Sequence, residues 1–199
     1  MEAPIKKLVK GEGIYEKGKF TSKINGSITK EYDLWKSMLT RCYDPKFHIR
    51  RPTYIGCTVS ENFKNFQYFA EWCNNQIGFG NRGWQLDKDI LLIGNKGYNE
   101  NICVFVPSQL NSLLINKSNY RGEEPVGVQL KSARNKYVAR ISIGGERKWL
   151  GTFDNEDDAF NSYKICKEYN IKEMAHKYEG LIDPRVYNCL MAWEIDRDV

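Results

Sequence analysis

The sequence has very few histidines and no long apolar run. Only two of its 199 residues are histidine, and His48 stands in a predicted loop with no ligand partner nearby, so we expect it to take no part in catalysis. No stretch approaches the roughly 18 consecutive apolar residues of a membrane span. Residues 1–10 also lack the apolar run and cleavage site of a secretory signal. The sequence therefore predicts a chain that stays in the cytoplasm and does not enter a membrane.

The six cysteines include no Cys-x-x-Cys pair. In a cytoplasmic protein such cysteines are most simply free thiols. Zinc needs convergent ligands, and the spacing of these cysteines predicts no zinc knuckle. A structural zinc site is therefore the less favoured alternative, and its ligands would be Cys42, Cys57, Cys73 and Cys103.

The composition is that of a folded chain with one or two domains. Hydrophobic residues make up 41% and aromatic residues 13% of the sequence, so the chain can bury a core and is not compositionally disordered. The formal net charge of +5 is mild. It permits binding to nucleic acid without requiring it.

Three short segments in which apolar and polar residues alternate precede one amphipathic segment near the C-terminus. They are 126–131, 136–143 and 147–153, and the last two are joined by Gly144 and Gly145, which favour a tight hairpin turn. We expect an antiparallel sheet, followed by a helix with Asp154 as its N-cap. The apolar residues of that helix, which should cover one face of the sheet, are Ala159, Phe160, Tyr163 and Cys166.

The other face of this sheet would carry cations, an indole and hydrogen-bonding side chains. Such a face suits DNA, because cations contact phosphates and guanine edges and a narrow sheet fits the major groove. Charged residues also belong on any solvated strand face, so alternation alone favours neither interpretation. The candidate DNA-binding residues are Gln129, Lys131, Arg134, Arg140, Ser142, Arg147 and Trp149.

The same stretch resembles the plant Apetala/ethylene-response-factor DNA-binding domain. The resemblance is carried by residues 126–128, 136–141, 149–153 and 158–163. In that family, exposed arginines and tryptophans of the sheet read the major groove, which implies double-stranded DNA as the partner. The preferred base sequence does not transfer, because arginine is usual in the plant domains at the positions of Gln129, Lys131 and Ser142.

The first part of the chain is predicted to be a basic arm followed by a helix. Residues 1–26 are polar and rich in lysine, so they form either a small hairpin at 13–20 or a loosely ordered arm. In either case their lysines are candidates for contacts with phosphate. A helix is expected from about Thr29 to Pro45. Residues 46–52 then form a basic loop, equally plausible as a DNA-backbone contact and as ordinary surface.

The middle of the chain is predicted to run strand, helix, strand, strand, helix. A short strand at 54–59 precedes a helix capped by Ser60, whose aromatic stripe is expected in the core. Two strands at 85–93 and 102–106 lead to a helix opened by Pro107. Strand, strand, helix is the element order of the ββα-metal nucleases.

Residues 31–116 resemble the HNH-related proteins of bacteriophages. Such proteins often carry an Apetala-type domain after this module, so the chain as a whole resembles an HNH homing endonuclease. The resemblance implies action in the cytoplasm of a phage-infected bacterium. It is carried by Trp35, Met38, Arg41, Cys42, Tyr43, Phe63, Phe66, Phe69, residues 86–90, Tyr98 and Cys103.

HNH enzymes place a metal ligand at the end of the first strand, a histidine base beside it, and a second ligand on the helix. By position, Asp87 and Asn111 would bind Mg²⁺ or Mn²⁺. The base position holds Lys88, which could act only if burial favoured its neutral form, and Asp89 is the nearest substitute. Two functions stay open: metal-dependent DNA cleavage, and an inactive scaffold that binds DNA as a regulator or inhibits a host factor.

The predicted fold class is α+β, in two modules. An N-terminal helical module with a degenerate HNH-like hairpin and helix precedes a three-stranded antiparallel sheet packed on one long helix. The segment between them is polar and bears glycine and proline, as boundaries do. A monomer is favoured over an oligomer. The predicted parts are a basic arm at 1–26, the HNH-like module at 27–116, a linker at 117–125, the Apetala-type domain at 126–180 and a tail with a helix at 181–199.

Overall fold

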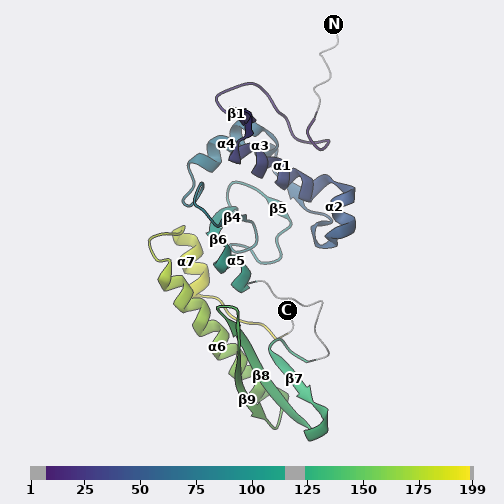
Figure 1. Cartoon of the computed structure of the whole chain (residues 1–199), viewed down its shortest axis with the longest axis vertical. Coiled ribbons are helices and arrows are strands. Elements are labelled where there is room, and N and C mark those ends of the chain that lie inside the picture. The colour runs from purple at the N-terminus through teal and green to yellow at the C-terminus, as the bar shows by residue number, and fades with distance from the viewer. Residues whose placement is uncertain (1–7, 115–123, 198–199) are drawn as a thin grey trace. The chain divides into compact units, whose positions relative to one another are not determined.

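The computed structural model describes residues 8–114 and 124–197 and divides the chain into two compact units, Met1–Ser108 and Gln109–Val199. Both units contain helices and strands (Figure 1), which confirms the α+β class. The predicted linker, 117–125, lies largely outside the described residues.

The first unit consists of short helices and three two-stranded sheets. β1 pairs with β2 and β4 with β6 in antiparallel fashion, whereas β3 and β5 are parallel. The elements are β1 (Lys23–Ile24), β2 (Ser27–Ile28), α1 (Lys30–Tyr43), α2 (Pro45–Arg50), the 3-10 turn η1 (Pro52–Tyr54), β3 (Thr58–Val59), α3 (Glu61–Lys64), α4 (Phe66–Asn74), β4 (Trp84–Asp87), β5 (Gly97–Tyr98) and β6 (Val104–Pro107), with α5 (Ser108–Leu114) beginning at the boundary.

An aromatic core holds this unit together. The helix predicted from about Thr29 is confirmed as α1, which contributes to this core. Trp35 and Leu39 of α1 are completely buried, as are Phe63 and Phe66. The Trp35 indole N–H donates to the Phe63 carbonyl over 2.8 Å, so the polar end of the largest core residue is satisfied. Each fully buried side chain of this kind contributes roughly 1.5–3 kcal/mol.

The single helix predicted after Ser60 is wrong, because two helices meet at Asn65. The Ser60 hydroxyl caps α3, and the Asn65 side chain accepts from Tyr68 N–H and starts α4 again. Asn65 is extended, which leaves the Lys64 carbonyl and Phe66 N–H free to bond with Ile14 at 2.8 and 3.0 Å. The N-terminal segment therefore docks where the helix is interrupted.

The predicted hairpin at 13–20 is also misplaced. The hairpin is β1–β2, and its turn is Asn25-Gly26, where both residues have positive φ as a primed turn requires. From residue 8 onward the arm is packed on the unit, and Lys10 and Lys19 pair with the carboxylates of Asp44 and Glu71. The lysines within 1–7 lie outside the described residues.

The predicted basic loop at 46–52 is wrong over most of its length, because α2 is helical. The Asp44 side chain accepts from Lys46 N–H and Phe47 N–H, and Pro45 occupies the first turn. An acidic N-cap followed by proline is a favourable helix start.

The strands predicted at 54–59 and 85–93 are shorter in the structure, where they are β3 and β4.

The second unit is the predicted three-stranded sheet with one long helix against it (Figure 1). The strand order is β7-β8-β9, all antiparallel. α5 groups with this unit from Gln109 onward, and the Lys167 ammonium of the long helix donates to the Leu113 carbonyl over 2.6 Å. The further elements are β7 (Val128–Lys131), the 3-10 turn η3 (Ser132–Arg134), β8 (Lys136–Ile143), β9 (Glu146–Phe153), α6 (Glu156–Lys177) and α7 (Pro184–Met191).

Asp154 is not the N-cap of α6, contrary to the prediction. The cap is Asn155, whose side-chain oxygen accepts from Asp158 N–H over 2.8 Å. Asp154 instead forms an ion pair with Lys136 across the sheet. The tail helix is confirmed as α7, which buries Val186 and Leu190.

A β-bulge divides β9 into two halves. Ala139 lies opposite Gly151, but the next residue, Arg140, lies opposite Trp149, so Leu150 is an extra residue. Gly151 has φ of 156°, which glycine adopts without strain. The bulge reverses the alternation, and as a result Trp149 and Phe153 point to opposite faces although they are four residues apart.

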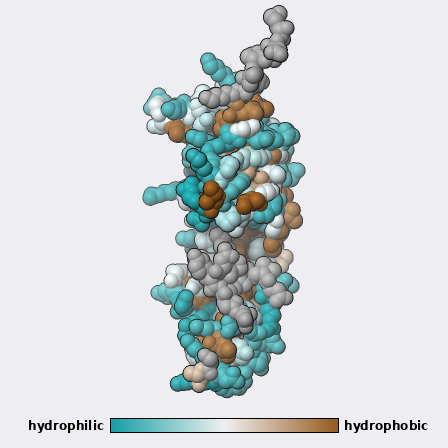
Figure 2. All heavy atoms as spheres, turned by 90° about the vertical axis from the view of Figure 1, so that its right-hand side faces the viewer, coloured by the Kyte–Doolittle hydropathy of each residue, from teal (hydrophilic) through white to brown (hydrophobic). Residues whose placement is uncertain are grey.

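Hydrophobic residues lie in small groups among hydrophilic ones on the face drawn in Figure 2. Within the ranges that the structure describes, no helix combines the length and the apolar character needed to cross a membrane.

Candidate nucleic-acid interface

Six of the seven candidate DNA-binding residues share one face of the sheet. The cross-strand pairs are Arg140 with Trp149 and Ser142 with Arg147. Gln129 and Lys131 of β7 are on the same side by register. The opposite face carries Ala139 and Ile141, which are buried where α6 packs on the sheet. We name the open side the sheet face; it comprises Gln129, Lys131, Lys136, Val138, Arg140, Ser142, Arg147, Trp149 and Thr152.

Arg134 is the exception among the candidates. It is exposed in η3, the turn between β7 and β8, at one end of the sheet rather than on the strands. The sequence prediction also missed Lys136 and Thr152. Lys136 follows from the alternation of β8, whereas Thr152 is placed on the sheet face only by the bulge.

Three of the four cations of the sheet face have no carboxylate partner among the described residues. Trp149 is 66% exposed, an unusual position for an indole. Among the salt bridges between described residues, none involves Lys131, Arg140 or Arg147. Lys136 is the one cation of this face with a partner, Asp154. The sheet face can therefore bind an anion without first breaking an ion pair at these three side chains.

Asp87, the candidate metal ligand of the first unit, is buried at the end of β4. Its Oδ1 accepts from Asp89 N–H at 2.8 Å and from Ile90 N–H at 2.7 Å. Burial raises the pKa of this carboxyl, and the two backbone N–H groups only partly oppose that effect. Asp87 thus fixes the start of a turn, residues 87–97, which we name the Asp87 turn.

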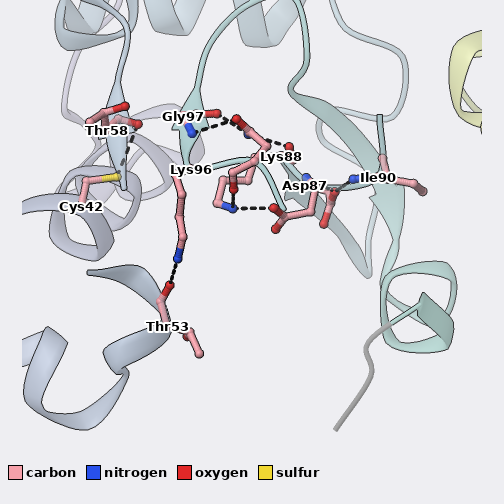
Figure 3. A network of polar contacts seen from close by, with 10 residues as sticks. Cys42, Thr53, Thr58, Asp87, Lys88, Ile90, Lys96 and Gly97 are labelled. Atoms are coloured by element: carbon pink, nitrogen blue, oxygen red, sulfur yellow. Dashed lines mark hydrogen bonds and ion pairs between the residues drawn. The ribbon is translucent and has the colours of Figure 1, made fainter. Parts of the chain in front are cut away.

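Lys88 is buried and joins the two ends of this turn (Figure 3). Its ammonium donates to Asp89 Oδ1 and to the Asn95 carbonyl, both over 2.6 Å. In return the Asn95 side-chain amide donates to the Lys88 carbonyl over 2.8 Å and to the Gly97 carbonyl over 2.6 Å. An ammonium in this position donates hydrogen bonds and offers no lone pair.

The side chains of the first unit that could act as metal ligands do not, among the described residues, form a site for a divalent cation. Among the residues placed by the structure, no group of three or more His, Cys, Asp or Glu side chains could hold a metal ion. Asp87 already gives one oxygen to the backbone and has an ammonium as its neighbour in sequence, whereas Mg²⁺ prefers several oxygen ligands. Asn111 lies on α5 beyond the unit boundary. Binding of Mg²⁺ or Mn²⁺ by Asp87 and Asn111, and catalysis by Lys88 and Asp89, stay predictions.

The four cysteines considered as zinc ligands are free, buried thiols. Burial raises the pKa of Cys42 and of Cys103 to about 12. A zinc ligand is a thiolate, so the apolar surroundings of these two side chains oppose the form that zinc requires.

Comparison with protein families, with curated proteins and with solved structures gave no match to this chain.

Proposed function

We propose that this chain binds double-stranded DNA through the sheet face. The observation that carries the proposal is the cross-strand pair of Arg140 and the exposed Trp149, on a face where Lys131 and Arg147 also lack a carboxylate partner among the described residues. Exposed cations attract the phosphate backbone, and arginine forms bidentate hydrogen bonds with guanine. The indole supplies apolar contact to bases. Together, these cationic and aromatic side chains complement the charge and the base edges of a DNA groove.

The sheet face would select the site on DNA. Arg147 and Ser142 lie side by side on neighbouring strands and offer hydrogen bonds to base edges. Lys131 and Arg134 lie toward the end of the sheet at η3 and suit phosphate contacts, which fix the register of the protein on the duplex. In this proposal the protein is a DNA-binding regulator that acts during phage infection of a bacterium.

Metal-dependent phosphodiester cleavage is the second candidate function. It is favoured by one observation: β4 and β6 pair antiparallel, α5 follows directly, and Asp87 ends the first of these strands. The hydrogen bonds of Asp87 and Lys88 favour a structural role instead. We therefore place DNA binding first.

The test of binding is fluorescence anisotropy with short labelled duplexes of random sequence. Replacing both Arg147 and Trp149 with alanine should weaken binding at least about tenfold, because a good base contact contributes about 1–3 kcal/mol. The matched control is Lys148→Ala, which removes a neighbouring exposed cation from the opposite side of β9. Equal affinity of the double variant and the parent chain would contradict the proposal.

The test of cleavage uses phage and bacterial genomic DNA with Mg²⁺, with Mn²⁺ or with chelator. Asp87→Asn is the appropriate control, because the amide oxygen still accepts from the backbone and keeps the turn. Discrete metal-dependent products that disappear with Asp87→Asn would establish a nuclease. Intact DNA together with a gel shift would establish a binding protein without cleavage.

A further inference from the structure

The tip of the Asp87 turn presents two adjacent aliphatic side chains to solvent. Leu92 is 54% and Ile93 is 66% exposed. They occupy the first two positions of a β-turn that is closed by Asn95 N–H donating to the Leu92 carbonyl over 3.2 Å. Gly94 follows with φ of 74°, as the third position of a type II turn requires. The turn therefore holds Ile93 at its outermost point.

Hydrogen bonds and one buried side chain support this tip. Lys88 and Asn95 bond reciprocally across the base of the turn, and Asp87 fixes its first residues. Ile90 is buried and anchors the near side of the turn. A preorganised tip loses little conformational entropy when it binds, so exposed aliphatic side chains here are suited to insertion into a partner.

Basic side chains that are unpaired among the described residues lie beside the tip. The segments 45–60 and 90–98 contain no Asp or Glu, and Asp89, which precedes the second segment, is paired with Lys88. The two segments are adjacent because β3 pairs with β5 and because the Lys96 ammonium donates to the Thr53 carbonyl over 2.7 Å (Figure 3). Arg50 and Arg51 are exposed, and no salt bridge between described residues includes them. A polyanion is the partner that complements this charge.

We propose that Leu92 and Ile93 form an apolar wedge that inserts between base steps of double-stranded DNA, while Arg50, Arg51 and Lys96 contact the flanking phosphates. This inference rests on the proposed function and assigns the first unit its own DNA contact. Apolar wedges unstack a base step and kink the duplex, which brings more protein surface against DNA. The buried Lys88 then has a defined role, because its hydrogen bonds hold the wedge in shape.

The experiment compares Leu92→Ala/Ile93→Ala with a matched control, Ile24→Ala/Ile28→Ala. The control residues are 62% and 54% exposed on the β1–β2 hairpin of the same unit. Duplexes enriched from a random pool by the parent chain are labelled at both ends, and bending is measured by energy transfer. The wedge variant should lose the bend and bind about tenfold more weakly, whereas the control should match the parent.

The salt dependence of DNA affinity distinguishes the contribution of the wedge from that of the basic residues beside it. The wedge variant should keep the parent's slope of log affinity against log salt, because it removes no cation from the interface. Arg50→Ala/Arg51→Ala should reduce that slope by roughly 0.9 for each phosphate that the protein no longer neutralises. Thermal unfolding of each variant checks that it is folded. We expect little change in stability, because the substituted residues are exposed.

The outcomes distinguish this inference from the proposed function. Unchanged bending and affinity of the wedge variant, with weaker binding by Arg147→Ala/Trp149→Ala, would overturn the wedge and support the sheet face. The reverse result would overturn the sheet face and support the wedge. No binding of the parent chain to any duplex would overturn both. Binding to phosphatidylserine vesicles that depends on Leu92 and Ile93, with DNA binding unaffected, would assign the tip to a membrane surface and overturn the wedge.

Discussion

The two compact units place their candidate functional residues in opposite environments. In the first unit Asp87 and Lys88 are buried, and they are the only buried charged residues among those the structure describes. In the second unit Arg147 and Lys131 stand on an open sheet face. Buried charges must be satisfied by the protein itself, whereas exposed charges without partners are available to a ligand.

This difference shows that the position of a residue in a sequence motif does not by itself establish its role. Asp87 and Lys88 were predicted as the metal ligand and the base of a nuclease, whereas the hydrogen bonds that the structure shows for them build a turn. On the sheet face, Lys131, Arg140 and Arg147 take part in no salt bridge between described residues. These three cations therefore remain available to a ligand.

The greatest loss of stability is expected when a ring is removed from the aromatic core of the first unit. Phe66→Ala should lower the free energy of unfolding by about 3–5 kcal/mol, because it leaves a cavity at a completely buried position. Urea denaturation measures the change. Tyr68→Ala, at an exposed position on the same helix, should change it by about 0.5 kcal/mol or less. Similar losses in the two variants would contradict this description of the core.

In the second unit, a loss of stability is expected when a side chain is added at Gly127. Gly127 has φ of 80°, and a Cβ there would lie 2.1 Å from the Tyr163 ring of α6. Gly127→Ala should cost about 2–5 kcal/mol, since backbone strain and overpacking add. Gly145→Ala introduces the same kind of backbone strain, but a Cβ there would have no neighbour within 4 Å. Thermal denaturation should therefore show that it lowers the free energy of unfolding by about 1–2 kcal/mol. A smaller loss at Gly127 than at Gly145 would show that α6 does not pack closely there.

A smaller effect tests whether Asp87 is structural. Asp87→Ala removes the acceptor of two backbone N–H groups and should cost about 1–3 kcal/mol. Asp87→Asn keeps an acceptor oxygen, so most of that stability should be retained. Hydrogen exchange at the amides of Asp89 and Ile90 provides the local measurement. Equal protection of these amides in both variants would remove the basis for calling Asp87 structural.

The smallest effect is a difference in pH response between two carboxyl groups of the first unit. Burial raises the pKa of Asp87, so the stabilisation from its protonated form is complete below the ordinary pKa of aspartate and is lost as pH rises through the raised value. The Lys10 ammonium lowers the pKa of Asp44, so that contribution is present above the ordinary pKa and is lost as pH falls through the lowered one. Carboxyl NMR titration should find Asp87 above and Asp44 below the usual range.

Much of the second unit could be predicted because its signals are local. The alternation from Lys136 to Ile143 gives the same bounds for β8 as the structure, and polar side chains on the open face follow from the same period. The bulge could not be predicted, because Leu150 becomes an extra residue only in relation to β8. The placement of Thr152 on the sheet face depends on the bulge and was missed for the same reason.

Four features of the first unit were not predicted from the sequence; two of them had local signals and two did not. Asn25-Gly26 marks the β1–β2 hairpin, and Asp44-Pro45 marks the start of α2, in the sequence itself. The interruption at Asn65 depends on Ile14, which is distant along the chain. Likewise, Lys88 reaches the Asn95 carbonyl only after the chain has folded back, and no spacing rule indicates that hydrogen bond.

The bulge in β9 divides the strand into an exposed part and a part constrained by packing. On one side of Leu150, Arg147 and Trp149 lie on the sheet face; on the other side, Phe153 faces the helix. Substitutions at Arg147 and Trp149 can therefore be made without disturbing the packing of Phe153. Under the proposed function, the contacts with DNA could thus change while the scaffold stays the same.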